Sequence, residues 1–150
     1  MKKLNQWIDR FAYSHPRFGI PNLMLYIVIA NAVTYILTLF AGAAALSFLK
    51  FDLYHVLHGE VWRLVTFVLL PFTYRPISLF IMLSFCYFVG GTLEREWGTA
   101  KFTLYYLSGM LFSVLSTVIL SLATGYYGWS LSDAYYINLT MFLAFAVMYP

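Results

Sequence analysis

Charged residues are scarce in this chain, and their scarcity excludes most classes of soluble protein. Asp, Glu, Lys and Arg make up 10% of the sequence, whereas hydrophobic residues make up 62%. A soluble domain usually carries about 25% charged residues. A fold with so little charge could not cover its own surface against water, so lipid is the expected solvent.

Cysteine and clusters of basic residues are nearly absent as well. Cys86 is the only cysteine, which excludes a disulfide within the chain. The net charge is only +3, and no basic cluster with interleaved aromatic residues occurs. Such clusters are typical of nucleic-acid binding, so nucleic acid is not an expected partner.

The few charges leave long apolar runs between them. No Asp, Glu, Lys or Arg occurs in 18–49, 76–93 or 102–132, and a fourth apolar run extends from Tyr135 to Pro150. A helix needs about 20 such residues to cross the hydrocarbon of a bilayer. We therefore expect an all-α integral membrane protein with about four transmembrane helices. Their expected ranges are 23–40 (possibly to 46), 77–93, 102–123, and a last helix that begins near residue 135. Because the fourth run is still apolar at Pro150, the sequence is interpreted as part of a longer protein.

The chain divides into residues 1–20 and a transmembrane domain over 21–150. In the first part, Leu4, Trp7, Ile8 and Phe11 fall at helical spacing among basic residues. This pattern is typical of a short amphipathic helix in the membrane surface. A disordered basic tail is the alternative.

The connecting segments carry most of the remaining charge. Residues 50–75 mix charged and apolar side chains and are expected to lie at the membrane interface, whereas 94–98 and 125–133 are expected to form turns. Basic residues favour the cytoplasmic side of a membrane. They are more numerous in 1–17 and 95–101 than in 50–75, so the N-terminus is predicted to be cytoplasmic.

Two motifs carry a resemblance to a known family. Residues 59–66, Gly-Glu-Val-Trp-Arg-Leu-Val-Thr, resemble the G-x-x-W-R-x-x-T signature that follows the first helix of rhomboid-family proteins. Residues 90–102 resemble the end of helix two of that family, with Glu94 and Gly98 at its Glu and Gly positions. The separation of the two motifs also matches, and the likeness covers about residues 20–150.

The resemblance implies a bundle of six helices and the chemistry of an intramembrane serine protease. The family implies a serine in a Gly-x-Ser-Gly motif on helix four and a histidine on helix six. It also implies a histidine and an asparagine, four residues apart on helix two, that help to form the oxyanion hole. A buried hydroxyl needs a base to act as a nucleophile, and the oxyanion needs donors aimed at it.

This sequence departs from the catalytic pattern of the family. The histidine and asparagine positions of helix two fall near Ser78 and Met82, and residues 136–142 contain neither serine nor glycine. Asn138 and Thr140 are the only candidates there for a remnant or recruited catalytic site. The departures resemble the non-proteolytic branch, which includes derlins and other rhomboid pseudoproteases.

Structural alternatives compete with a functional role at every candidate position. Trp62 and Arg63 could contact a substrate, but they suit anchoring of the loop at the interface better. Glu94 suits a charged turn better than catalysis, and Asn138 and Thr140 are expected to bond to a neighbouring helix.

Other residues give weaker signals of a site. His55 and His58 share a helical face, but no third ligand is in view, so neither a metal site nor a cofactor is predicted. Gly109, Ser113, Ser116 and Thr117 form a face of small residues on the third helix, which is typical of helix packing in membranes.

Three functional interpretations remain. The leading one is a rhomboid-like membrane protein without protease activity that binds transmembrane segments of other proteins or locally thins the bilayer. The second is an active rhomboid-like protease, with a hydroxyl such as that of Thr140 as its nucleophile. A transporter or channel subunit is less favoured, because transport usually requires charged residues inside the bilayer and the predicted spans contain no Asp, Glu, Lys, Arg or His.

Overall fold

The computed structural model describes residues 2–15, 17–71, 73–126 and 134–150, and these residues form helices but no β-strand. The helical elements are α1 (Lys2–Ser14), α2 (Leu23–Ala41), η1 (Ala43–Phe48), α3 (Leu53–Leu57), α4 (Arg63–Thr66), η2 (Phe67–Leu69), α5 (Pro76–Trp97), α6 (Thr99–Thr124) and α7 (Ala134–Met148). The expected all-α class is confirmed for this part of the chain.

Three of these helices are long and apolar enough to cross a membrane. They are α2, α5 and α6, with mean hydropathies of 2.1, 1.7 and 1.9. The length and hydropathy of these helices confirm the expectation of a membrane protein. α7 has 15 residues, fewer than a typical span needs. The fourth span therefore stays a prediction.

The boundaries of the long helices agree with the sequence to within one residue except where α5 and α6 meet: α6 begins at Thr99, three residues before its predicted start. Residues 94–97, predicted to be part of a charged turn, continue the α5 helix, and Gly98 alone separates α5 from α6. Gly98 has a φ of 85°, which glycine adopts without the steric cost that other residues meet. The turn expected over 125–133 lies almost entirely outside the described residues.

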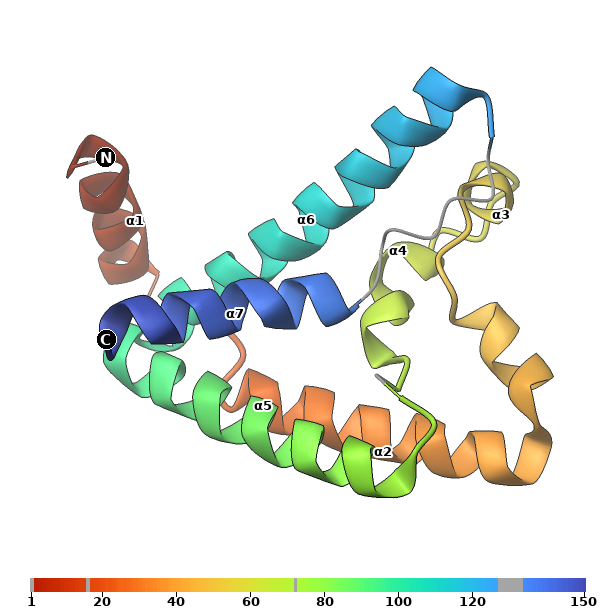
Figure 1. Ribbon diagram of the computed structural model, residues 1–150. Helices are drawn as coiled ribbons and strands as arrows, with labels where there is room; N and C mark the ends of the chain where they lie inside the picture. The colour runs from red at the N-terminus through yellow and green to blue at the C-terminus, as the bar shows by residue number, and fades with distance from the viewer. Residues whose placement is uncertain (1, 16, 72, 127–133) are drawn as a thin grey trace.

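α2 and α5 pack closely against each other, and Figure 1 shows them side by side with α7 along the other flank of α5. A glycine permits the close approach of α2: a Cβ atom at Gly90 would lie 2.4 Å from Cγ of Met24. Buried residues from α5, α6, α7 and η2 complete the core. They include Cys86, Leu93, Phe102, Met141 and Phe67.

Two polar side chains of α2 hold the loop that follows it. Asn31 is fully buried, and its Nδ2 donates to the carbonyl of Val68 at 3.2 Å. The Thr34 hydroxyl donates to the carbonyl of Leu69 at 2.6 Å. A backbone carbonyl away from water needs such a partner, so this pair allows η2 to lie against the apolar helix α2.

The outer faces of the three long helices are apolar and exposed. Large side chains such as Ile36, Phe80, Phe88 and Ile119 are at least half accessible. Soluble monomers rarely expose apolar surface continuously along several helices. The pattern is consistent with contact to the acyl chains of a bilayer.

Candidate functional site

Arg63, the arginine of the Trp-Arg motif, lies inside the loop between α2 and α5. Only 5% of the residue is exposed, and its Nη1 donates to the carbonyls of Ser47 and, at 2.8 Å, Lys50. Its Nε pairs with the carboxylate of Glu60. One guanidinium therefore connects the end of η1 to the start of α4. A lysine ammonium could not make all of these contacts, because it lacks the planar fork of N–H donors. Arg63 therefore holds the loop through the protein's own backbone.

Trp62, its neighbour in the motif, points outward. It is 54% exposed, and it directly precedes α4. The indole therefore remains accessible for the interfacial contact that the sequence predicts for it.

Glu94 and Gly98 form a corner that receives the start of α2. The Glu94 carboxylate accepts from the backbone N–H of Asn22 at 2.8 Å and from the Thr99 hydroxyl at 3.3 Å. The backbone N–H of Ile20 donates to the Thr103 hydroxyl at 3.2 Å. Glu94 thus joins three segments of the fold.

Glu96 lies two residues after Glu94 and has a separate partner. Its carboxylate accepts from the Tyr149 phenol at 3.0 Å, which links the ends of α5 and α7. This hydrogen bond is the main reason that the pKa of the Tyr149 phenol is raised above its usual value.

A groove of about 580 Å³ lies between α6 and α7. The wall formed by α6 combines small and hydroxylated residues with two aromatic residues. α7 supplies three further lining residues. The lining residues are Tyr105, Ser108, Gly109, Phe112, Ser113, Ser116, Tyr136, Ile137 and Thr140. The face of small residues predicted on the third helix is thus largely the wall of an open groove, except that Thr117 is fully buried.

Asn138 and Thr140, the two weak catalytic candidates, occupy different positions on α7. Asn138 is fully buried in the protein. Thr140 lines the groove, but its hydroxyl donates to the carbonyl of Ile137 in its own helix at 2.7 Å. The contact between α6 and α7 here is made by the Thr140 carbonyl instead, which accepts from the Tyr105 phenol at 2.9 Å.

The histidines do not line this groove. His55 lies in α3, where its Nδ1 is 2.8 Å from the Asp52 carboxylate, and Nδ1 of His58 is 2.7 Å from the carbonyl of Tyr54. His15 follows α1 directly. In the ranges that the structure describes, no three His, Cys, Asp or Glu side chains converge as metal ligands.

The helix-two positions of the rhomboid pattern lie in the first turns of α5. Ser78 is exposed there, and Met82 packs against the core. Neither residue lines the groove beside Thr140.

Sequence reasoning missed Asn31, Thr34 and most of the residues that form the groove. Asn31 carries the clearest signal that was available, because an amide in the middle of an apolar helix needs partners within the protein. Tyr105 and Phe112 carry no signal of this kind, since aromatic residues are common throughout the chain.

Comparison of the chain with protein-family models, curated proteins and solved structures gives no match. The class that the fold defines is an all-helical membrane protein with three helices able to span the bilayer.

Proposed function

We propose that this chain is a rhomboid-like membrane protein without protease activity that binds transmembrane segments of other membrane proteins. The observation that carries the proposal is the open groove between α6 and α7. The six-helix plan, the fourth span and the cytoplasmic N-terminus belong to the same proposal.

The walls of the groove suit a helix from another protein. Gly109, Ser113 and Ser116 are small and follow one another at spacings of three and four residues on α6. In lipid, helices associate through close packing and interhelical hydrogen bonds, because burial of apolar surface gives no advantage there. Small side chains allow the required close approach, while Phe112 and Tyr136 at the groove provide large packing surfaces.

The groove supplies little for catalysis. None of its described lining residues is His, Lys, Asp, Glu or Cys, and the phenol of Tyr105 donates a hydrogen bond to the Thr140 carbonyl, so the groove offers Thr140 no strong general base. The Thr140 hydroxyl is used within its own helix. Together with the unmatched Gly-x-Ser-Gly and helix-two positions, these features support binding over peptide-bond hydrolysis.

Photocrosslinking on α6 tests the binding proposal. Phe112 lines the groove and Ile119 does not, and the two side chains are similarly exposed at 68% and 64%. We expect benzoylphenylalanine at position 112 to crosslink to transmembrane segments in native membranes, and the same group at position 119 to react mainly with lipid. Mass spectrometry of the crosslinked peptides identifies the products.

A second pair of variants separates the groove from general exposure. Ser116→Phe fills the groove, whereas Leu115→Phe enlarges an exposed side chain that does not line it. The crosslinks from position 112 should fall at least about tenfold with Ser116→Phe, which corresponds to a loss of about 1.4 kcal/mol of binding, and persist with Leu115→Phe. Crosslinks that persist equally in both variants would contradict the groove as the binding site.

A fluorophosphonate probe tests the absence of protease activity. We expect no covalent labelling of the purified protein in detergent, because no base activates the Thr140 hydroxyl. Labelling measured by in-gel fluorescence that disappears with Thr140→Ala would establish the protease interpretation instead. An active rhomboid protease labelled in parallel serves as the positive control.

A further inference from the structure

We infer that α1 is a docking helix for the anionic headgroups of the leaflet at its end of the protein. The surface is formed by Lys3, Trp7, Arg10 and Phe11 of α1 and by Arg17 of the segment that follows. The inference is independent of the proposed binding of transmembrane segments.

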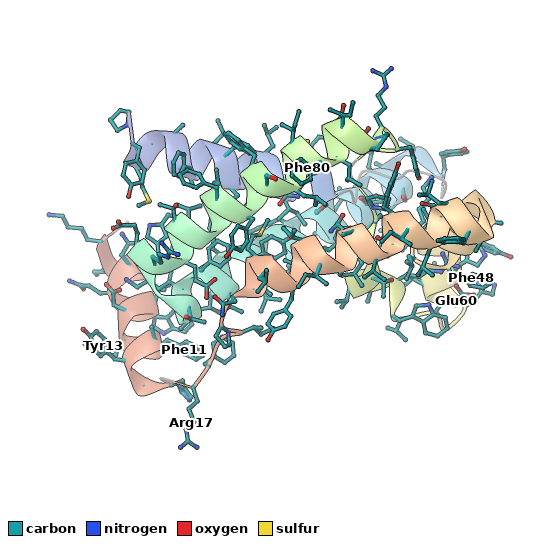
Figure 2. The ribbon with its side chains drawn as sticks, turned by 90° about the horizontal axis from the view of Figure 1, so that it is seen from below. Phe11, Tyr13, Arg17, Phe48, Glu60 and Phe80 are labelled. Carbon is teal, nitrogen blue, oxygen red and sulfur yellow. The ribbon has the colours of Figure 1, made fainter. Side chains whose placement is uncertain are left out.

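The position of α1 places it at the membrane surface. In both views α1 lies across one end of the bundle, transverse to α5 and next to the start of α6 (Figures 1 and 2). This end is where α5 and α6 meet at Gly98. A helix that crosses the end of a bundle of membrane-spanning helices lies close to the plane of the headgroups.

The apolar face of α1 is not buried against the rest of the protein. α1 has no buried residue, and Leu4 and Trp7 are 62% and 63% exposed. Trp7 stacks on Phe11, and Phe11 packs edge-on against Phe18 in the segment leading to α2. Figure 2 shows Phe11 on the side of α1 that faces along the bundle and Tyr13 on the opposite side. The aromatic row of Trp7 and Phe11 is therefore directed toward the acyl chains that surround the bundle.

The charge of the N-terminal segment indicates that the bound headgroups are anionic. Asp9 is the only acidic residue in the first 17 positions, and it pairs with Lys101 of α6. The remaining charged side chains of this segment are all basic: Lys2, Lys3, Arg10 and Arg17. Basic residues beside an apolar helical face are attracted to anionic lipids, and the attraction is screened by salt.

The Asp9–Lys101 pair also fixes how α1 is turned. Asp9, Ala12 and Tyr13 adjoin the corner formed by Trp97, Gly98 and Thr99. On a helical wheel, this side lies nearly opposite Leu4 and Phe11. Contact with the corner therefore leaves Leu4 and Trp7 of the apolar face exposed to lipid.

An environment-sensitive fluorophore on α1 tests the inference. The full chain carrying Cys86→Ala and Leu4→Cys is labelled with nitrobenzoxadiazole and placed in nanodiscs. The discs contain phosphatidylcholine alone or an equal mixture of phosphatidylcholine and phosphatidylserine. We expect emission at shorter wavelength in the anionic discs, and loss of that shift at high salt and in the Lys2→Gln/Lys3→Gln/Arg10→Gln/Arg17→Gln variant.

Two controls make the result specific to this face and this charge. Lys50→Gln/Arg75→Gln removes exposed basic residues from the loop between α2 and α5 and should keep the shift. A label at Tyr13→Cys, on the side away from the aromatic row, should show no shift. Equal emission in both lipids, a shift that survives neutralisation of α1, or an equal shift at positions 4 and 13 would each overturn the inference.

Discussion

Replacing Arg63 with alanine is expected to lower the free energy of unfolding by about 2–4 kcal/mol, the range for removing a buried charged donor from several acceptors. The carbonyls of Ser47 and Lys50 and the carboxylate of Glu60 would all lose a charged donor. The loop between α2 and α5 should loosen first. Unfolding by SDS in mixed dodecyl maltoside micelles measures the loss, and limited proteolysis within 50–75 locates it.

Two further variants show whether geometry or charge is responsible. Arg63→Lys keeps the positive charge but not the fork of donors, so we expect it to recover less than half of the lost stability. Arg75→Ala removes an exposed arginine from the end of the same loop and should change stability by less than about 0.5 kcal/mol. Equal stability of Arg63→Ala and the unmodified protein would mean that the motif does not hold the loop.

Adding a single methyl group at Gly90 is expected to destabilise the contact between α2 and α5 by about 1–3 kcal/mol, the usual cost of overpacking. The new Cβ would lie 2.4 Å from Cγ and 2.9 Å from Cβ of Met24. The latter atom is attached to the backbone, so a change of Met24 rotamer alone could not relieve the clash. The same unfolding measurement in mixed micelles tests Gly90→Ala.

The adjacent glycine gives a matched control. A Cβ atom at Gly91 would meet nothing within 4 Å, so Gly91→Ala should leave stability unchanged or raise it by up to about 1 kcal/mol through helix propensity. In a Met24→Ala background, Gly90→Ala should cost less than it does alone, because the two residues are in contact. Equal effects of the two glycine substitutions would show that α2 does not press on Gly90.

The three long helices could be predicted because apolar runs and charge boundaries determine them directly. The predicted ranges 23–40, 77–93 and 102–123 fall within α2, α5 and α6. The error at 94–97 has a physical cause. Charged residues do not end a helix by themselves, and α5 continues until Gly98 adopts a positive φ.

The contacts of the candidate sites could not be predicted in the same way. Glu94 is bonded to the backbone of Asn22, 72 residues earlier, and Arg63 to carbonyls 13 and 16 residues away. Such partners depend on how the helices cross, which periodicity does not specify. The small residues of α6 indicated helix packing, but only the structure shows which of them line the groove beside α7.

The unequal lengths of α6 and α7 have a consequence for the surrounding lipid. At 1.5 Å per residue, the 26 residues of α6 extend about 39 Å and the 15 residues of α7 about 22 Å, whereas the hydrocarbon layer is about 30 Å thick. With α7 as the proposed fourth span, acyl chains beside it would have to shorten or tilt to match it, and deforming them would cost free energy for every ångström of mismatch. An apolar helix seated along α7 would displace those distorted lipids, so relief of bilayer strain would add to the attraction between the two.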